Sequence, residues 1–291
     1  MEYDKINGNV GFKEDGHYYG NLKDPSIKYT SVTTLIGKYE PEFDKEFVSK
    51  YKALERLLPL DIWKKEKGKL WKSHRIPNEF LEVYDISKKD LNKVQQDILD
   101  EWTKINKESC DRGTKIHAQL ENSFYKAGSN ITLKKFGIGG KFECKKNYNE
   151  LDLEYGVYPE YLIYYDNPKL NLHIAGQIDL LIKNGNDIYI ADWKTNKSID
   201  LKGFYNSSTR STEKLKYPLA SLDNCNFNVY QLQLSTYAWM LQKINPNFII
   251  KDLLLNHFAH DGKETLYHCT YLKDDVEKML KHFVKQQKIE Q

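Results

Sequence analysis

The alternation of apolar and polar residues is clearest over residues 174–195. Isoleucine or leucine occupies most even positions from 174 to 182, which is the two-residue period of a strand. A second apolar run, 188–191, is typical of a more deeply buried strand. Between them stands Asn184-Gly185, a dipeptide that favours a type I′ turn because both residues tolerate a positive φ. The pattern predicts two antiparallel strands joined by a tight turn.

Helical and strand-like periods flank this hairpin. The segment 88–126 reads as a long helical region, which we expect to break near Gly113. Further helices are predicted over 43–58, 228–243 and 274–288, and strands over 155–165, 249–258 and 265–269, with short strands around turns within 10–29.

Three charged residues, Asp179, Asp192 and Lys194, stand in the otherwise apolar hairpin. Because Asp192 and Lys194 are two residues apart, both side chains leave the same face of their strand. Buried charge costs too much free energy unless it is paired or binds a metal. An ion pair at a strand end would account for Asp192 and Lys194 alone. With Asp179 added, two carboxylates and an ammonium favour a site for a hard divalent cation.

The surrounding motifs resemble those of a known family. Gly-x-Ile-Asp at 176–179 and Asp-Trp-Lys-Thr at 192–195 resemble motifs II and III of the PD-(D/E)xK nuclease superfamily, in its RecB-type branch. Arg-Gly-Thr-x-x-His-x-x-x-Glu at 112–121 resembles motif I of that branch, and Gln-x-x-x-Tyr at 233–237 resembles its last motif. The four motifs follow the family's order, so the resemblance covers residues 112–237.

The resemblance implies metal-assisted hydrolysis of phosphodiester bonds with Mg²⁺ or Mn²⁺, and with two ions. Asp179 would bridge the ions, while Asp192, His117 and the main-chain carbonyl of Trp193 would complete the ligand set. Lys194 would orient the attacking water or stabilise the charge that builds on the phosphate.

The same resemblance implies that Gln233 and Tyr237, which share a helix face, touch the substrate or the catalytic lysine. His117 and Glu121 also share a helix face, and Glu121 either supports the site or only the helix. Glu160, in the strand 155–165, is either a further ligand or supporting group, or an edge-strand acid that faces water.

The segment 29–36 (YTSVTTLI) resembles the start of phage and mitochondrial relatives of this branch. Ser31 and Thr33 would bind a phosphate at a helix N-terminus, or Ser31 would simply cap a short helix.

The resemblance implies an α/β, restriction-endonuclease-like core, in which a mixed central sheet is flanked by helices in the order αβββαβ. We expect a partly helical N-terminal elaboration over 1–88 and the nuclease core over 89–291. Basic and aromatic residues interleave at 62–75, which suits either a single-strand binding surface or a solvated helix. The segment 196–226 is predicted to be a long loop, either one that contacts DNA and orders on binding or a cleavage-susceptible linker.

Composition adds mainly exclusions. The net charge of +3 does not indicate a nucleic-acid binder, so any phosphate-binding surface must be local. The four cysteines are widely spaced, which predicts no disulfide framework, zinc ribbon or iron–sulfur cluster. Gly139-Gly140-Lys141 lacks the first glycine of a Walker A loop, so we expect no ATP use. There is no signal-like or membrane-spanning run, and we expect a cytoplasmic protein of a bacterium or a phage-infected cell.

The combined prediction is a DNA exonuclease that prefers single strands or DNA ends, acting in replication, recombination or repair, where a protein of those pathways could be its partner. Two alternatives remain open. One is a structure-specific endonuclease with the same chemistry, and the other is a non-catalytic DNA-binding module.

Overall fold

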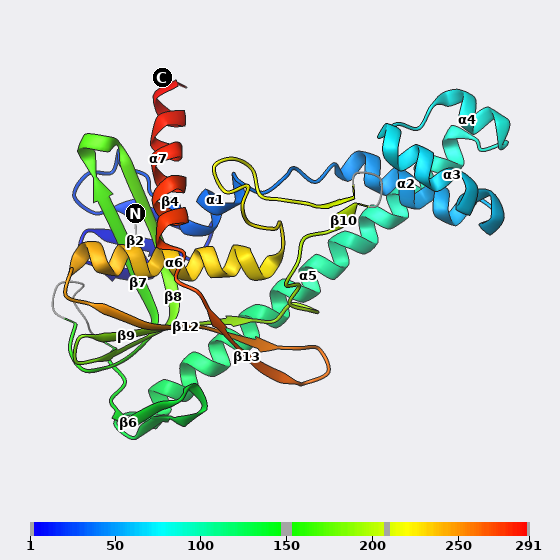
Figure 1. Cartoon of the computed structure of the whole chain (residues 1–291). Coiled ribbons are helices and arrows are strands. Elements are labelled where there is room, and N and C mark those ends of the chain that lie inside the picture. Colours follow the sequence, from blue (N-terminus) through cyan, green and yellow to red (C-terminus); the bar gives the residue numbers. More distant parts are fainter. Residues whose placement is uncertain (1–2, 147–152, 207–209, 290–291) are drawn as a thin grey trace. The chain divides into compact units, whose positions relative to one another are not determined.

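The computed structural model describes residues 3–146, 153–206 and 210–289 (Figure 1). The chain forms two compact units, one of residues 1–41, 113–206 and 211–291 and the other of residues 42–112 and 207–210. This division differs from the expected boundary between residues 88 and 89. The N-terminal strands pack on the central sheet of the first unit, whereas the start of the long helix packs in the core of the second unit.

A mixed sheet forms the centre of the first unit. Its strand order is β13-β12-β9-β8-β4, and β7 pairs with the other edge of β8. β9 is parallel to β12 and β4 is parallel to β8, and the remaining pairs are antiparallel. The strands are β4 (Thr30–Ser31), β7 (Gly156–Asn167), β8 (Leu172–Asn184), β9 (Asp187–Lys194), β12 (Ile249–Phe258) and β13 (Glu264–Cys269).

Apolar side chains cover both faces of this sheet. One face packs against α1 (Val32–Gly37), α6 (Asn226–Ile244) and α7 (Lys273–Ile289). The opposite face packs against the hairpin of β5 (Ile131–Leu133) and β6 (Ile138–Phe142). The C-terminal part of α5 (Lys88–Ala127) also packs on that face. The order α5, β7, β8, β9, α6, β12 confirms the predicted αβββαβ core with a mixed sheet flanked by helices (Figure 1).

Smaller elements complete both units. A three-stranded sheet of β1 (Lys5–Asn7), β2 (Val10–Lys13) and β3 (Tyr18–Asn21) packs on β7 and β8, which confirms the predicted short strands. The second unit contains α2 (Lys45–Leu57), α3 (Leu60–Ser73), α4 (Asn78–Val83) and the start of α5, around a core that includes the buried Trp63. Two 3-10 turns lie at Lys134–Phe136 and Pro168–Leu170.

Three local expectations are wrong. α5 runs through Gly113 without a break; a Cβ at Gly113 would stand 3.4 Å from Thr195 Oγ1, so the helix passes beside the end of β9. The hairpin turn centres on Gly185 and Asn186, with positive φ at Gly185 and not at Asn184, because Asn184 pairs with Asp187. The apolar run of β8 also changes face between Ile178 and Leu180.

The segment after β9 is mostly irregular, apart from the two-residue strands β10 (Tyr205–Asn206) and β11 (Ser211–Thr212), which pair with each other. Part of the predicted loop, residues 207–209, lies outside the described residues. Several hydrogen bonds hold the described part to α6; among them, Asp200 N donates to Asn226 Oδ1 at 2.7 Å and Asn226 Nδ2 donates to Ser198 O at 2.9 Å.

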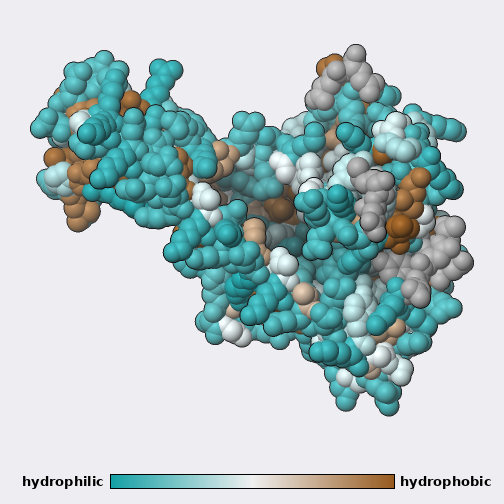
Figure 2. All heavy atoms as spheres, turned by 180° about the vertical axis from the view of Figure 1, so that it is seen from behind, coloured by the Kyte–Doolittle hydropathy of each residue, from teal (hydrophilic) through white to brown (hydrophobic). Residues whose placement is uncertain are grey.

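The surface is largely polar: hydrophilic residues cover most of the face shown in Figure 2. Among the described helices, none combines the length and the apolar character that crossing a bilayer requires.

Candidate metal centre

The site begins where β8 and β9 part. The ladder between these strands ends at the pair Leu180–Ala191, so Asp179 and Asp192 are the next residues on either side of the opening. Trp193 N donates to Asp179 Oδ2 at 2.7 Å, and this bond takes the place of the strand-to-strand bond expected there. Both carboxylates are buried, with exposed fractions of 8% for Asp179 and 2% for Asp192.

Three potential metal ligands meet on one side of Asp179. Donor atoms of His117, Glu160 and Asp179 all lie within 4.8 Å of one another. His117 comes from α5, and its Nδ1 lies 3.6 Å from Glu160 Oε1 and 3.7 Å from Asp179 Oδ1. The other ring nitrogen, Nε2, lies 2.9 Å from Trp193 O, so hydrogen bonding to that carbonyl holds the imidazole with Nδ1 towards the acids.

The register of β7 brings Glu160 to this cluster. Pro159 pairs with Leu180 and Tyr161 with Ile178, so Glu160 stands opposite Asp179. Glu160 has a φ of 51°, a conformation that a residue with a side chain adopts at a cost. Only 13% of its side chain is exposed, which excludes the alternative of an edge-strand acid facing water.

Lys194 lies on the other side of Asp192, towards α6. Its Nζ is 2.8 Å from Asp192 Oδ2 and donates to Gln233 Oε1 at 3.3 Å. Gln233 Nε2 in turn lies 3.3 Å from both Asp192 Oδ1 and Tyr237 Oη. The ion pair expected from the sequence is therefore present, and it is part of a network that α6 supports.

The charges at this site perturb one another. Burial and the nearby Asp192 carboxylate raise the pKa of Asp179 to about 8. Burial alone would lower the pKa of His117, but the nearby carboxylates of Glu160 and Asp179 outweigh it and raise this pKa to about 9. Burial likewise opposes the ammonium form of Lys194, yet Asp192 and Asp179 hold its pKa above the usual value.

The donor set fits a hard divalent cation. Asp179 and Glu160 supply carboxylate oxygens, the ligands that Mg²⁺ prefers, and the imidazole of His117 is a ligand that Mn²⁺ also accepts. Two of the expected ligands have protein partners in this structure: Asp192 is paired with Lys194, and the Trp193 carbonyl contacts His117.

Gly176 lets Tyr237, the last residue of the Gln-x-x-x-Tyr motif, pack against the sheet. A Cβ at Gly176 in β8 would stand 2.6 Å from Tyr237 Cε1, so only glycine allows Tyr237 to pack there. Tyr237 is 3% exposed. Its contact with Gln233 thus connects the first residue of the Gly-x-Ile-Asp motif to the lysine network.

The remaining expected residues are more peripheral. Glu121 accepts a hydrogen bond from Tyr125 Oη at 3.0 Å and lies 3.8 Å from Lys5 Nζ, which is also 4.0 Å from Glu160. Ser31 caps α1 by accepting from Thr34 N at 3.0 Å, as one alternative predicted. The phosphate-binding role of Ser31 and Thr33 stays a prediction.

Sequence reasoning missed Lys5 and Tyr230. Lys5 reaches the site from β1, and no local pattern marks it. Lys194 Nζ lies 4.6 Å from the centre of the Tyr230 ring. Tyr230 stands three residues before Gln233 on α6, and this spacing, which places both on one helix face, is the signal that could have identified it.

Comparisons with known proteins give little further identification. No family model matches the chain, and no curated protein matches it. A solved structure described as "Putative exonuclease" from Eubacterium rectale has 11% identity, covers 89% of this chain and 77% of that one, and has a TM-score of 0.29. The structure of SSO0001 has 15% identity and a TM-score of 0.27, covers 45% of this chain, and is matched over 50% of its own length. Neither similarity defines a function for this chain.

Proposed function

We propose that this chain is a metal-dependent deoxyribonuclease of the RecB-type branch of the PD-(D/E)xK superfamily. One observation carries the proposal. Donor atoms of His117, Glu160 and Asp179 come together, and Lys194 forms an ion pair with the neighbouring Asp192. A lysine with only 17% of its side chain exposed, next to two buried carboxylates, is costly as packing. It is useful where a phosphate must be bound and a water molecule oriented.

In this proposal Asp179, Glu160 and His117 would hold Mg²⁺ or Mn²⁺. Asp192 and the Trp193 carbonyl stay expected ligands, but in this structure Asp192 is paired with Lys194 and the carbonyl contacts the ring nitrogen of His117 that points away from the acids. A bound ion would polarise the scissile phosphate and lower the pKa of the attacking water. Lys194, positioned by Asp192 and Gln233, orients that water or stabilises the charge on the phosphate. A second ion stays part of the proposal, and Asp179 would be the residue that helps to hold both ions.

The substrate that we propose is DNA, cut as an exonuclease cuts it, from single strands or ends. The support is the order and spacing of the four motifs along residues 112–237. We place the reaction in replication, recombination or repair in the cytoplasm, with a protein of those pathways as a potential partner.

The test uses end-labelled DNA, single- and double-stranded, linear and circular, with Mg²⁺, Mn²⁺ or EDTA. We expect cleavage of linear DNA that EDTA abolishes and that Lys194→Ala abolishes without loss of the fold. Lys251→Ala is the matched control, since Lys251 lies 3.6 Å from Asp187 in an ion pair elsewhere on the same sheet. Cleavage of circles would favour the endonuclease, DNA binding without cleavage would favour the non-catalytic module, and full activity in Lys194→Ala would refute the mechanism.

A further inference from the structure

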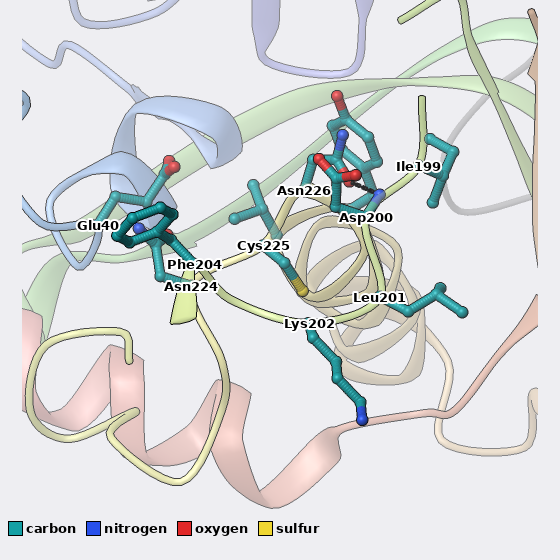
Figure 3. A pocket seen from close by; sticks show the side chains of 11 residues that line it. Glu40, Ile199, Asp200, Leu201, Lys202, Phe204, Asn224, Cys225 and Asn226 are labelled. Carbon is teal, nitrogen blue, oxygen red and sulfur yellow. Dashed lines mark hydrogen bonds between the residues drawn. The ribbon is translucent and has the colours of Figure 1, made fainter. Parts of the chain in front are cut away.

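A cavity of about 1010 Å³ lies next to the candidate metal centre, between the loop after β9 and the start of α6 (Figure 3). We call it the base pocket; its lining is Glu40, residues 199–202, Phe204, residues 224–226, Val229 and Tyr230. Tyr230 joins the two places, because its ring lines this cavity and also contacts Lys194. Anything bound at Lys194 therefore has a large cavity beside it.

Aromatic rings give the base pocket a stacking surface. Phe204 is 61% exposed, and it lies at one side of the cavity near Glu40 (Figure 3). Tyr230 provides a second ring, fixed by its hydroxyl, which donates to Asn196 Oδ1 at 2.8 Å. Exposed rings in a groove beside a phosphate site are what single-stranded nucleic acids stack on.

The polar groups of the pocket suit a base better than a phosphate. The side chain of Glu40 has no hydrogen-bond or ion-pair partner among the described residues, and burial raises the pKa of its carboxyl group. Asp200 supplies a second carboxylate on the other side (Figure 3); its main-chain N donates to Asn226 Oδ1, and its Oδ1 accepts from Ser198 Oγ at 3.3 Å. Carboxylates repel phosphate but accept hydrogen bonds from base amino groups, such as N4 of cytosine. Lys202 extends away from both acids (Figure 3), where its ammonium group can contact the sugar-phosphate backbone of a bound nucleic acid.

We infer that the base pocket takes one unpaired nucleobase of the strand whose phosphate is bound at Lys194. Phe204 and Tyr230 contact the ring of that base, and Glu40 accepts a hydrogen bond from its edge. This inference rests on the proposed function, since it places a DNA strand at the candidate metal centre. A paired base must first leave its complement before it can enter, so the pocket gives the protein a preference for single strands and unpaired ends.

The test uses single-stranded oligonucleotides that carry the fluorescent base 2-aminopurine at one position each, with Asp179→Asn protein and Ca²⁺ to prevent cleavage. We expect a fluorescence change at one or two adjacent positions only. Phe204→Ala should remove that change and weaken binding by roughly 5- to 150-fold, the range expected for losing one stacked base. Tyr217→Ala is the matched control, because Tyr217 is 74% exposed on the same segment but does not line the pocket.

A second variant tests recognition of the base edge. Glu40→Gln should reduce the preference for cytosine over thymine at the responding position and leave the stacking signal in place. Equal effects of Phe204→Ala and Tyr217→Ala, or the same fluorescence at every position, would overturn the inference while wild-type cleavage still supported the proposed function. A position-specific signal from wild-type protein that cuts no DNA in Mg²⁺ or Mn²⁺ would refute hydrolysis and keep the pocket as a single-strand binding site.

Discussion

Gly176→Ala tests directly how Tyr237 packs on the central sheet. A Cβ at this buried position of β8 would lie 2.6 Å from Tyr237 Cε1 and 3.0 Å from Tyr237 Oη. Real Cβ contacts essentially never fall below 3.0 Å, so either Tyr237 or β8 must move. Tyr237 is 3% exposed and its hydroxyl lies 3.3 Å from Gln233 Nε2, which leaves it little room to move. Overpacking of this kind costs about 1–3 kcal/mol, or roughly 5- to 150-fold in the unfolding equilibrium constant.

The assay is urea unfolding of metal-free protein, followed by circular dichroism. Gly139→Ala is the matched control, because a Cβ at this exposed position of β6 meets nothing within 4 Å. A double-mutant cycle with Tyr237→Ala adds a second criterion: the cost of Gly176→Ala should largely disappear once the ring is gone. If Gly176→Ala unfolds like Gly139→Ala, or if its cost is the same with and without the Tyr237 ring, the explanation of this glycine is wrong.

Three further predictions follow from the charges, thiols and close contacts. The pKa of Asp179 is raised from 3.8 to about 8 in the folded protein, so between about pH 4 and pH 8 the unfolded chain has lost a proton that the folded protein keeps. The free energy of unfolding therefore falls as the pH rises through this range. Metal-free Asp179→Asn should thus gain stability over wild type between pH 5 and pH 9 in urea titrations, and an unchanged difference across that range would contradict the assignment. Burial raises the pKa of Cys269 to about 12, whereas Cys110 is exposed. A disulfide reagent at pH 8 should therefore label Cys110 rapidly and Cys269 only after denaturation, as peptide mapping would show, and rapid labelling of Cys269 in the native protein would exclude this burial. Gly113→Ala should be tolerated, while Gly113→Leu should push α5 from Thr195 and weaken Mn²⁺ binding measured by calorimetry; equal affinity in both variants would count against this role of the glycine.

The sequence predicted best what depends on neighbouring residues. The hairpin, the placement of Asp192 and Lys194 on one face, and the helices that carry His117 and Gln233 all follow from local period and spacing. The turn was displaced by one residue because Asn-Gly can occupy two registers, and the choice depends on how far the flanking strands pair.

What could not be predicted depends on contacts between distant segments. The position of Glu160 is set by the register of β7 on β8, and its positive φ has no sequence signature in a glutamate. Lys5 reaches Glu121 and Glu160 across more than a hundred residues of chain. The uninterrupted α5 is a related case: the low helix propensity of Gly113 indicated a break, but the helix continues through it, because tertiary context can override propensity.

The parting of β8 and β9 has a practical consequence for mutagenesis. One carboxylate oxygen of Asp179 points towards His117. The other accepts a hydrogen bond from the main-chain N of Trp193, at the point where the hydrogen bonds between the two strands end. Asp179→Ala would remove both the carboxylate charge and this hydrogen bond. An inactive Asp179→Ala protein could therefore have lost either a metal ligand or the position of the end of β9. Asp179→Asn keeps an oxygen that can accept the hydrogen bond from Trp193 N, so a change in its activity reports the loss of the charge alone.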